Sequence, residues 1–244
     1  LQNRSCLSTP EKQKGEGRGM TEYTTDNNWV TLAGKVSTAL SFSHEMYGEG
    51  FYSFILAVPR LSNYVDQLPV TISERLIGGV DLNVGAEVLI EGQFRSYNKF
   101  ADGANRLVLT VFAREISNRT EEVHNPNQIF LNGFLCKPPV YRTTPFKREI
   151  ADLLVAVNRA YNKSDYIPTI AWGRNARFCQ DLDVGDHLKI WGRIQSRDYQ
   201  KKHPTGEVEE RVAYEVSVSK MEVAGEEEES GEDPQQSEPD QTEQ

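Results

Sequence analysis

The sequence predicts an all-β protein made of two tandem copies of one small barrel. Runs of β-branched and aromatic residues recur at short intervals, separated by polar segments that contain Gly, Pro, Asn and Asp. The order of these runs repeats once along the chain, and stretches without hydrophobic periodicity flank both ends. The repeat indicates two domains of the same fold rather than one large core.

Each copy contributes five predicted strands, with room for one short helix after the third. They lie at residues 27–40, 51–60, 67–76, 86–97 and 105–116, and again at residues 128–139, 149–160, 165–173, 186–197 and 212–223. Five strands with an interior glycine bend fit a closed Greek-key barrel of the OB-fold type. A β-sandwich of similar strand count is the alternative.

Matching residues support a duplication. Pro69 and Pro168 lie 99 residues apart, and Gly92 and Gly192 lie 100 apart. We therefore expect a disordered extension at 1–27, a first OB-fold domain at 28–118, a linker at 119–126, a second OB-fold domain at 127–224 and a disordered acidic tail at 225–244. Because Met20 precedes the first predicted strand, residues 1–19 are expected to be an upstream extension or a non-standard start.

The net charge of −9 is unevenly distributed. Residues 225–244 carry nine acids and no Lys or Arg, residues 1–126 sum to −3, and residues 127–224 sum to +3. The acidity therefore belongs to the tail, while the second copy is mildly basic. This distribution leaves a nucleic-acid partner open.

The chain lacks the motifs of common enzyme classes. Its four histidines are isolated, and neither a zinc-ligand spacing, a phosphate-binding loop nor a nucleophile elbow occurs. We expect no enzymatic activity, no metal and no cofactor. Three scattered cysteines and the absence of a run of 18 apolar residues predict a cytoplasmic protein without a membrane span.

Rings and cations interleave in residues 148–202 of the second copy. Cations attract phosphates, and exposed rings stack on unpaired bases, so this composition is typical of a single-strand-binding surface. Tyr166 and Trp172 are six residues apart and should share one face of a strand. Leu188, Ile190 and Ile194 should face the barrel core, with Lys189, Trp191, Arg193 and Gln195 on the other side.

Short motifs of the second copy occur in a fixed order. They are Asn-x-Ile-x-Leu-x-Gly at 127–133, Pro-x-x-Arg-x-Thr at 139–144, an apolar run at 154–157, Asp-Tyr-Ile-Pro-x-x-Ala-Trp-Gly at 165–173, Val-Gly at 184–185 and Gly-Arg-Ile-Gln-Ser-Arg at 192–197. Together they resemble the bacterial single-stranded-DNA-binding protein family over residues 127–222. The resemblance implies an OB-fold, non-catalytic binding of single-stranded DNA in replication, repair or recombination, and four OB-folds per assembly, hence a homodimer.

The resemblance also implies the residues of the site. The four stacking positions of the family fall on Tyr161, Tyr166, Trp172 and Tyr199. Phosphate contacts are expected from neighbouring cations, namely Arg142, Arg159, Arg174, Arg193, Arg197, Lys201 and Lys202.

The first copy differs at these positions. Its counterparts of the first three rings are Ser62, Gln67 and Ser73, so we expect it mainly to support dimerisation or spacing. Residual contacts are predicted at Tyr97, Lys99 and Phe100.

Two other functional readings stay open: single-stranded RNA as the ligand, and an OB-fold interaction module such as a primosome-like adaptor. In the family, an acidic tail ends in an apolar tip that docks replication or repair proteins. This chain ends Asp-Gln-Thr-Glu-Gln, which puts that partner role in doubt. The tail could instead compete with DNA for the basic surface, or act only as a solubility tail.

Overall fold

The computed structural model describes residues 27–101, 103–119, 121, 123–202 and 206–225. The N-terminal extension and the acidic tail that the sequence predicts lie outside these ranges, except for Asn27 and Gly225. The first half of the chain contains β1 (Asn28–Val36), β2 (Ser41–Met46), β3 (Glu49–Pro59), β4 (Val65–Ser73), α1 (Glu74–Ile77), β5 (Glu87–Ala101) and β6 (Ala104–Asn118). The second half contains β7 (Asn127–Leu135), β8 (Val140–Thr143), β9 (Glu149–Arg159), β10 (Lys163–Trp172), α2 (Arg174–Phe178), the 3-10 turn η1 (Cys179–Asp181), β11 (His187–Lys202) and β12 (Val208–Val223).

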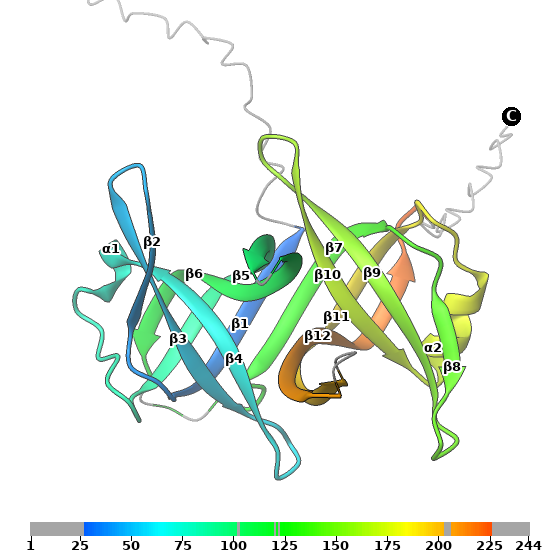
Figure 1. The fold of residues 1–244 in the computed structure, drawn as a ribbon, viewed down its shortest axis with the longest axis horizontal. Helices are drawn as coiled ribbons and strands as arrows, with labels where there is room; N and C mark the ends of the chain where they lie inside the picture. The colour runs from blue at the N-terminus through cyan, green and yellow to red at the C-terminus, as the bar shows by residue number, and fades with distance from the viewer. Residues whose placement is uncertain (1–26, 102, 120, 122, 203–205, 226–244) are drawn as a thin grey trace, which may run out of the picture.

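Over the described residues, the strands form one 12-stranded sheet in the order β2-β3-β4-β6-β5-β1-β7-β11-β12-β10-β9-β8 (Figure 1). A further β3–β1 pairing closes the first half into a five-stranded barrel, and β7–β9 closes the second. We call these the first and second barrels. The prediction of an all-β protein with two five-stranded barrels and a short helix after the third barrel strand is confirmed.

Two strands outside the barrels were missed by the sequence analysis. β2 is exposed along its whole length and β8 has only four residues. Each pairs with one neighbour at an edge of the sheet, so neither has a buried face. Because hydrophobic alternation arises from one-sided burial, such edge strands carry no periodic signal.

Inside each barrel, alternate residues fill the core. Leu188, Ile190 and Ile194 are fully buried on β11, as predicted. A β-bulge between Trp191 and Gly192 shifts the register of β11 on β12 and bends the strand. A Cβ at Gly192 would collide with the backbone carbonyl oxygen of Ser217, so this close approach of two strands requires glycine.

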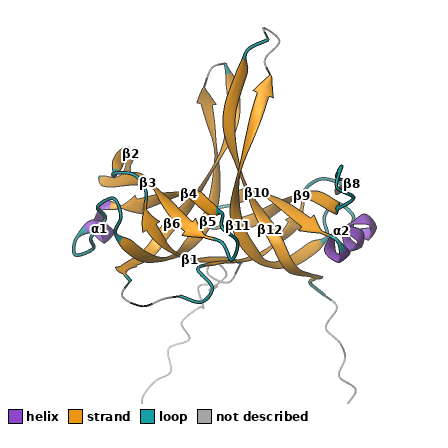
Figure 2. Cartoon of the chain, turned by 90° about the horizontal axis from the view of Figure 1, so that it is seen from below, coloured by secondary structure: helices purple, strands orange, loops and turns teal. Residues whose placement is uncertain are grey.

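The two barrels are joined through their first strands. β1 and β7 pair antiparallel, with Trp29 opposite Phe130, so the sheet runs from one barrel into the other without a break. On the other side of the molecule, the β5–β6 and β11–β12 hairpins rise as two arms (Figure 2). The charged residues of the second arm lie mostly on strands, because β11 extends to Lys202 and β12 begins at Val208. Among the described helices, none is long and apolar enough to cross a bilayer.

Candidate nucleic-acid interface

The outer face of β10 carries two of the four predicted rings. Tyr166 and Trp172 are 46% and 38% exposed, and Pro168 lies between them on the same side of the strand. The indole N–H of Trp172 donates a 3.2 Å hydrogen bond to the Ser217 hydroxyl on β12. This bond fixes the orientation of the Trp172 ring while part of its surface stays accessible.

The other two predicted rings lie outside this strand. Tyr161 is in the turn between β9 and β10, almost fully exposed, with a φ of 62° that is uncommon for a non-glycine residue. Tyr199 lies on the β11 arm opposite Arg211 and is partly exposed. β10 also pairs with β12, which is the partner strand of β11 and thus links the strand of Tyr166 and Trp172 to the arm that carries Tyr199.

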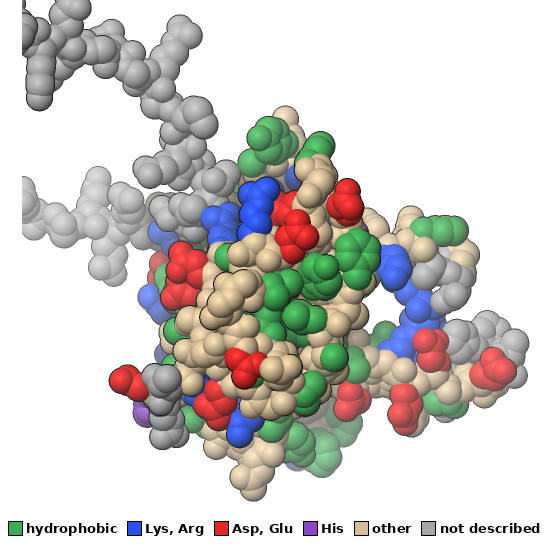
Figure 3. Space-filling view, turned by 90° about the vertical axis from the view of Figure 1, so that its left-hand side faces the viewer, with side chains coloured by type: hydrophobic (Ala, Val, Ile, Leu, Met, Phe, Trp, Pro, Cys, Tyr) green, Lys and Arg blue, Asp and Glu red, His purple; other side chains and the backbone are tan. Residues whose placement is uncertain are grey.

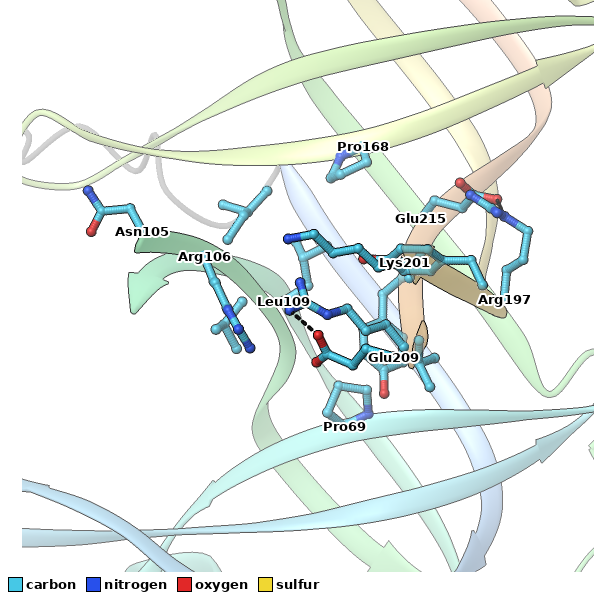
Figure 4. Close-up of a pocket in the computed structure, with 16 residues that line it drawn as sticks. Pro69, Asn105, Arg106, Leu109, Pro168, Arg197, Lys201, Glu209 and Glu215 are labelled. Atoms are coloured by element: carbon cyan, nitrogen blue, oxygen red, sulfur yellow. Dashed lines mark hydrogen bonds and ion pairs between the residues drawn. The ribbon is translucent and has the colours of Figure 1, made fainter. Parts of the chain in front are cut away.

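A groove of about 930 Å³ runs between the two hairpin arms. Pro69 from the first barrel and Pro168 from the second line it on opposite sides (Figure 4). Three predicted site residues line it, Arg197, Tyr199 and Lys201. Pro168 belongs both to the groove and to the outer face of β10, so the two surfaces are continuous.

The charges in the groove are mixed. Arg106 and Arg211 add two cations to its lining, while Glu209 and Glu215 add two acids. The Arg197 Nε lies 3.6 Å from the Glu215 carboxylate, and Arg211 forms a 2.6 Å ion pair with Glu209. The Arg197 side chain is 56% exposed, so an incoming phosphate can compete for its guanidinium group at small cost, whereas Arg211 is 17% exposed and is held by Glu209.

The remaining exposed cations lie apart from the groove. Arg142 on β8 forms a 2.8 Å ion pair with Asp152, with about half of its side chain exposed. Arg174 is the exposed first residue of α2, directly after the segment that ends in Trp172. Lys202 is the last residue of β11.

Arg159 and Arg193 have a different environment from the other predicted cations. Arg193 lies 3.6 Å from Asp66 of the first barrel, and Arg159 lies 3.3 Å from Asp165. Both aspartates are buried at the contact between the barrels. The two arginines are therefore engaged by carboxylates at this contact, which leaves them less available to phosphates than the cations of the groove.

The contact itself was missed by the sequence analysis. Asp66 accepts a 2.7 Å hydrogen bond from the Ser196 backbone N–H, and Asp165 accepts one of 2.7 Å from the Ser96 backbone N–H. Each aspartate therefore reaches from its own barrel to a strand of the other. We call the four residues, Asp66, Ser196, Asp165 and Ser96, the inter-barrel lock.

The lock follows the internal repeat but is not fully symmetric. Arg60 donates hydrogen bonds of 2.7 and 2.5 Å to Asp66, whereas its counterpart Arg159 makes only the longer ion pair with Asp165.

Burial raises the pKa of Asp165, and the Ser96 N–H and the charge of Arg159 oppose this shift. The same burial lowers the pKa of Arg193, with repulsion from Arg60 adding to it. A signal was present in the sequence, because Arg60 and Asp66 match Arg159 and Asp165 at a spacing of 99.

The first barrel carries a group of aromatic rings that the comparison of the two sequence copies did not indicate. His44 stacks on Phe51 at 4.9 Å, Phe51 lies 5.8 Å from Phe112, and the Arg95 guanidinium lies 4.4 Å over the Phe112 ring. Viewed from this end of the molecule, hydrophobic side chains gather near the middle of the surface (Figure 3). These rings lie at positions other than those of the second barrel, which is why position-by-position comparison missed them.

The family comparison matches the second barrel. The model of the family described as "Single-strand binding protein family" matches residues 126–224 of this chain. A single-stranded DNA-binding protein of Clostridium tetani is 35% identical over 98 residues, which are 37% of this chain and 68% of that protein. Single-stranded DNA-binding protein B of Bacillus subtilis is 31% identical over 86 residues, 31% of this chain and 74% of its own length.

A solved structure matches both barrels. The wild-type single-stranded DNA binding protein from Thermus aquaticus superimposes with a TM-score of 0.64 over 88% of this chain and 96% of that one, at 21% identity. At this identity the likeness concerns the fold, and it extends to the tandem arrangement. The relatives of Clostridium tetani and Bacillus subtilis, each matched over two thirds or more of its length, show that this chain belongs to the single-strand binding protein family.

Proposed function

We propose that this protein holds single-stranded DNA on the second barrel, along the outer face of β10 and through the groove between the arms. The observation that carries the proposal is the continuity of the two surfaces at Pro168. Tyr166 and Trp172 would stack on bases, and Arg197 and Lys201 would bind phosphates beyond them. Base stacking contributes about 1–3 kcal/mol per base and tolerates any sequence.

Such a surface suits protection of single strands in replication, repair or recombination, because it recognises the unpaired state and not a sequence. Tyr161 and Tyr199 would extend the stacking surface at its two sides. Arg142 and Arg174 would contact phosphates at the outer end of the path. Arg159 and Arg193 would chiefly hold the barrels together through the lock, with segment 119–126 as the linker between two domains.

We also propose that two chains associate through the outer face of the sheet where the barrels join. A row of side chains crosses three adjacent strands there: Trp29 on β1, Phe130 on β7 and Trp191 on β11. Trp29 is 42% exposed, and Phe130 and Trp191 are in contact at 5.1 Å. Phe130 and Trp191 are half-buried, and partly exposed rings in a row on a broad sheet are typical of a protein interface.

The charges at the ends of this row favour a second copy of the chain as the occupant. On the first barrel, Glu91 and Glu115 lie directly opposite each other in the ladder, a repulsive pair. On the second barrel, the equivalent ladder pair is Trp191 and Lys220, with the Lys220 ammonium 4.5 Å above the ring. A two-fold axis that puts the first barrel of one copy over the second barrel of the other brings acids onto cations in both contacts.

A titration of oligo-dT, followed by tryptophan fluorescence at several salt concentrations, tests the DNA-binding proposal. Stacking should quench Trp172, and the affinity should fall steeply with salt as counterions are released. A parallel titration with oligo-rU measures the preference between DNA and RNA. Absence of quenching and of binding at low salt would reject the proposed surface and favour the adaptor reading.

A further inference from the structure

The sheet ends in two edge strands. Among the described strands, β2 and β8 each pair with a single neighbour, β3 and β9, and they lie at opposite ends of the long axis of the molecule (Figure 1). All six residues of β2 are exposed, and so are three of the four residues of β8. Each strand therefore presents a row of backbone N–H and C=O groups that no described strand pairs, and such a row is a template for a further strand.

The two edges are equivalent through the internal repeat. Val30 of β1 lies opposite Ile129 of β7, its counterpart 99 residues later, in an antiparallel pair, so an approximate two-fold axis relates the barrels. Ser41 and Val140, the first residues of β2 and β8, occupy matching positions on β3 and β9. The two edge strands therefore run in opposite directions, and a copy shifted along the long axis brings its β8 beside β2 in antiparallel orientation.

The two edges carry opposite charge. Residues 41–49, which contain β2 and its turn into β3, have two glutamates and no Lys or Arg, whereas residues 137–148, which contain β8 and its turn into β9, have four cations and no acid. Glu45 is exposed near the end of β2, and Lys137 is exposed shortly before the start of β8. In an antiparallel pair the end of one strand lies beside the start of the other, so these two charges come together.

Charge selects which edges can meet. Pairing of β2 with β2, or of β8 with β8, brings like charges together, whereas pairing of β2 with β8 joins acid to cation. Glu49 is already held by Arg75 at 3.0 Å within the chain. Arg142 is held likewise by Asp152 at 2.8 Å, so the other charges of the two edges carry the discrimination.

We propose that β2 of one molecule pairs with β8 of a second copy, so that neighbouring molecules on a DNA strand continue each other's sheet. This contact is separate from the proposed dimer, which uses the broad face of the sheet. It joins two different surfaces, and every chain carries both, so it adds molecules in an open row. Its role, cooperative binding to a long strand, rests on the proposed binding of single-stranded DNA.

The contact is short. β8 has four residues, with Pro138 and Pro139 before it and Pro145 after it, and proline has no N–H to donate, so the ladder ends close to the strand. On the other edge, a bulge between Phe42 and His44 interrupts the regular ladder of β2. Such a contact is weak between free molecules and becomes effective when a common strand holds them side by side at high effective concentration.

The ratio of the affinities for poly-dT and for a short oligo-dT measures this contact. An oligo-dT of about 15 nucleotides is filled by one assembly of four OB-folds, at roughly 4 nucleotides or more for each. Glu45→Lys should lower the ratio about fivefold or more, since it places cation on cation, and Lys137→Glu should do the same with two acids. A chain with both exchanges should recover the ratio of the parent, because the charges meet again with their signs reversed.

A matched control separates the edge contact from a general effect of charge. Glu121→Lys makes the same exchange at an exposed position of the linker, outside both edges. It should leave the ratio unchanged, because a general gain of positive charge strengthens the binding of both ligands.

A parent protein that binds poly-dT without cooperativity would overturn the contact, and so would a chain with both exchanges that keeps the lowered ratio. A parent that binds neither ligand would reject the proposed function, and sedimentation velocity at high protein concentration then tests the contact without DNA. Assemblies larger than the dimer, in the parent and in the chain with both exchanges but not in the single variants, support the contact. Their absence from the parent would overturn it.

Discussion

The Asp66 carboxylate on β4 accepts a 2.7 Å hydrogen bond from the Ser196 backbone N–H on β11, across the contact between the barrels. The side chain is fully buried, and the Arg60 guanidinium neutralises it within its own barrel. Separation of the barrels would break the hydrogen bond between the Ser196 N–H and the Asp66 carboxylate before water could replace it. A buried carboxylate with these partners therefore tolerates little displacement. The lock therefore fixes the two halves of the groove relative to each other.

Loss of this carboxylate should destabilise the whole chain. Asp66→Ala leaves the Arg60 guanidinium partly buried without its partner, which costs about 3–5 kcal/mol for a buried ion pair. Urea denaturation followed by tryptophan fluorescence gives the free energy of unfolding. The control is Asp152→Ala, which breaks an exposed ion pair with Arg142 and should cost less than about 1 kcal/mol. Equal costs for the two variants would show that the lock adds no stability.

The other aspartate of the lock gives a prediction about pH. The pKa of Asp165 is raised above its ordinary value of 3.8 because burial disfavours the charged form. Protonation of Asp165 thus favours the folded state: its stabilising contribution is complete below the ordinary value and is lost as the pH rises through the raised pKa. Asp165→Asn does not titrate there. The parent protein should therefore lose stability relative to this variant as the pH rises from about 4 through that window.

A pH-independent difference in the free energy of unfolding between the parent and Asp165→Asn would contradict this assignment. It would indicate that the Ser96 N–H and Arg159 together compensate for the burial of the carboxylate. Unfolding curves at several pH values in one buffer series, at constant ionic strength, make the measurement.

The sequence predicted the barrels well because their signal is local. Leu188, Ile190 and Ile194 alternate with polar residues, and this pattern requires one buried face whatever the rest of the chain does. The lock gave no such signal. Asp66 and Asp165 match in the repeat, but their partners Ser196 and Ser96 lie on the opposite barrel, and only the placement of the barrels brings them together. The ion pair between Arg193 and Asp66 gave no local signal for the same reason.

Removal of one ring should measure the stacking contribution. Trp172→Ala deletes an accessible indole on the outer face of β10 and should weaken oligo-dT binding by about 1–3 kcal/mol. The control is Tyr47→Ala, which removes a fully exposed ring from the β2–β3 turn, outside the proposed path. Fluorescence anisotropy of a labelled oligo-dT avoids dependence on the lost tryptophan. An unchanged dissociation constant for Trp172→Ala would mean that the indole only packs on Ser217.

The cations of the groove should set the salt dependence. For single strands, each phosphate contact contributes about 0.7 to the slope of log affinity against log salt. Arg197→Ala with Lys201→Ala should therefore lower that slope by about 1.4 if both contact phosphates. Lys35→Ala removes an exposed cation that pairs with Glu87 on β5 and should leave the slope unchanged. A double variant with the slope of the parent would place the phosphates elsewhere.

Charge reversal tests the proposed dimer and the relative orientation of its two copies. Glu91→Lys puts like charges on Lys220 of the second copy at both symmetric contacts, which should weaken the dimer roughly a hundredfold or more. It also relieves the Glu91–Glu115 repulsion within each chain, so the monomer should not be destabilised. Lys220→Glu should weaken the dimer as well. A chain with both changes should dimerise again, because the reversed charges meet across the two-fold axis; sedimentation velocity that shows no such recovery would exclude this orientation.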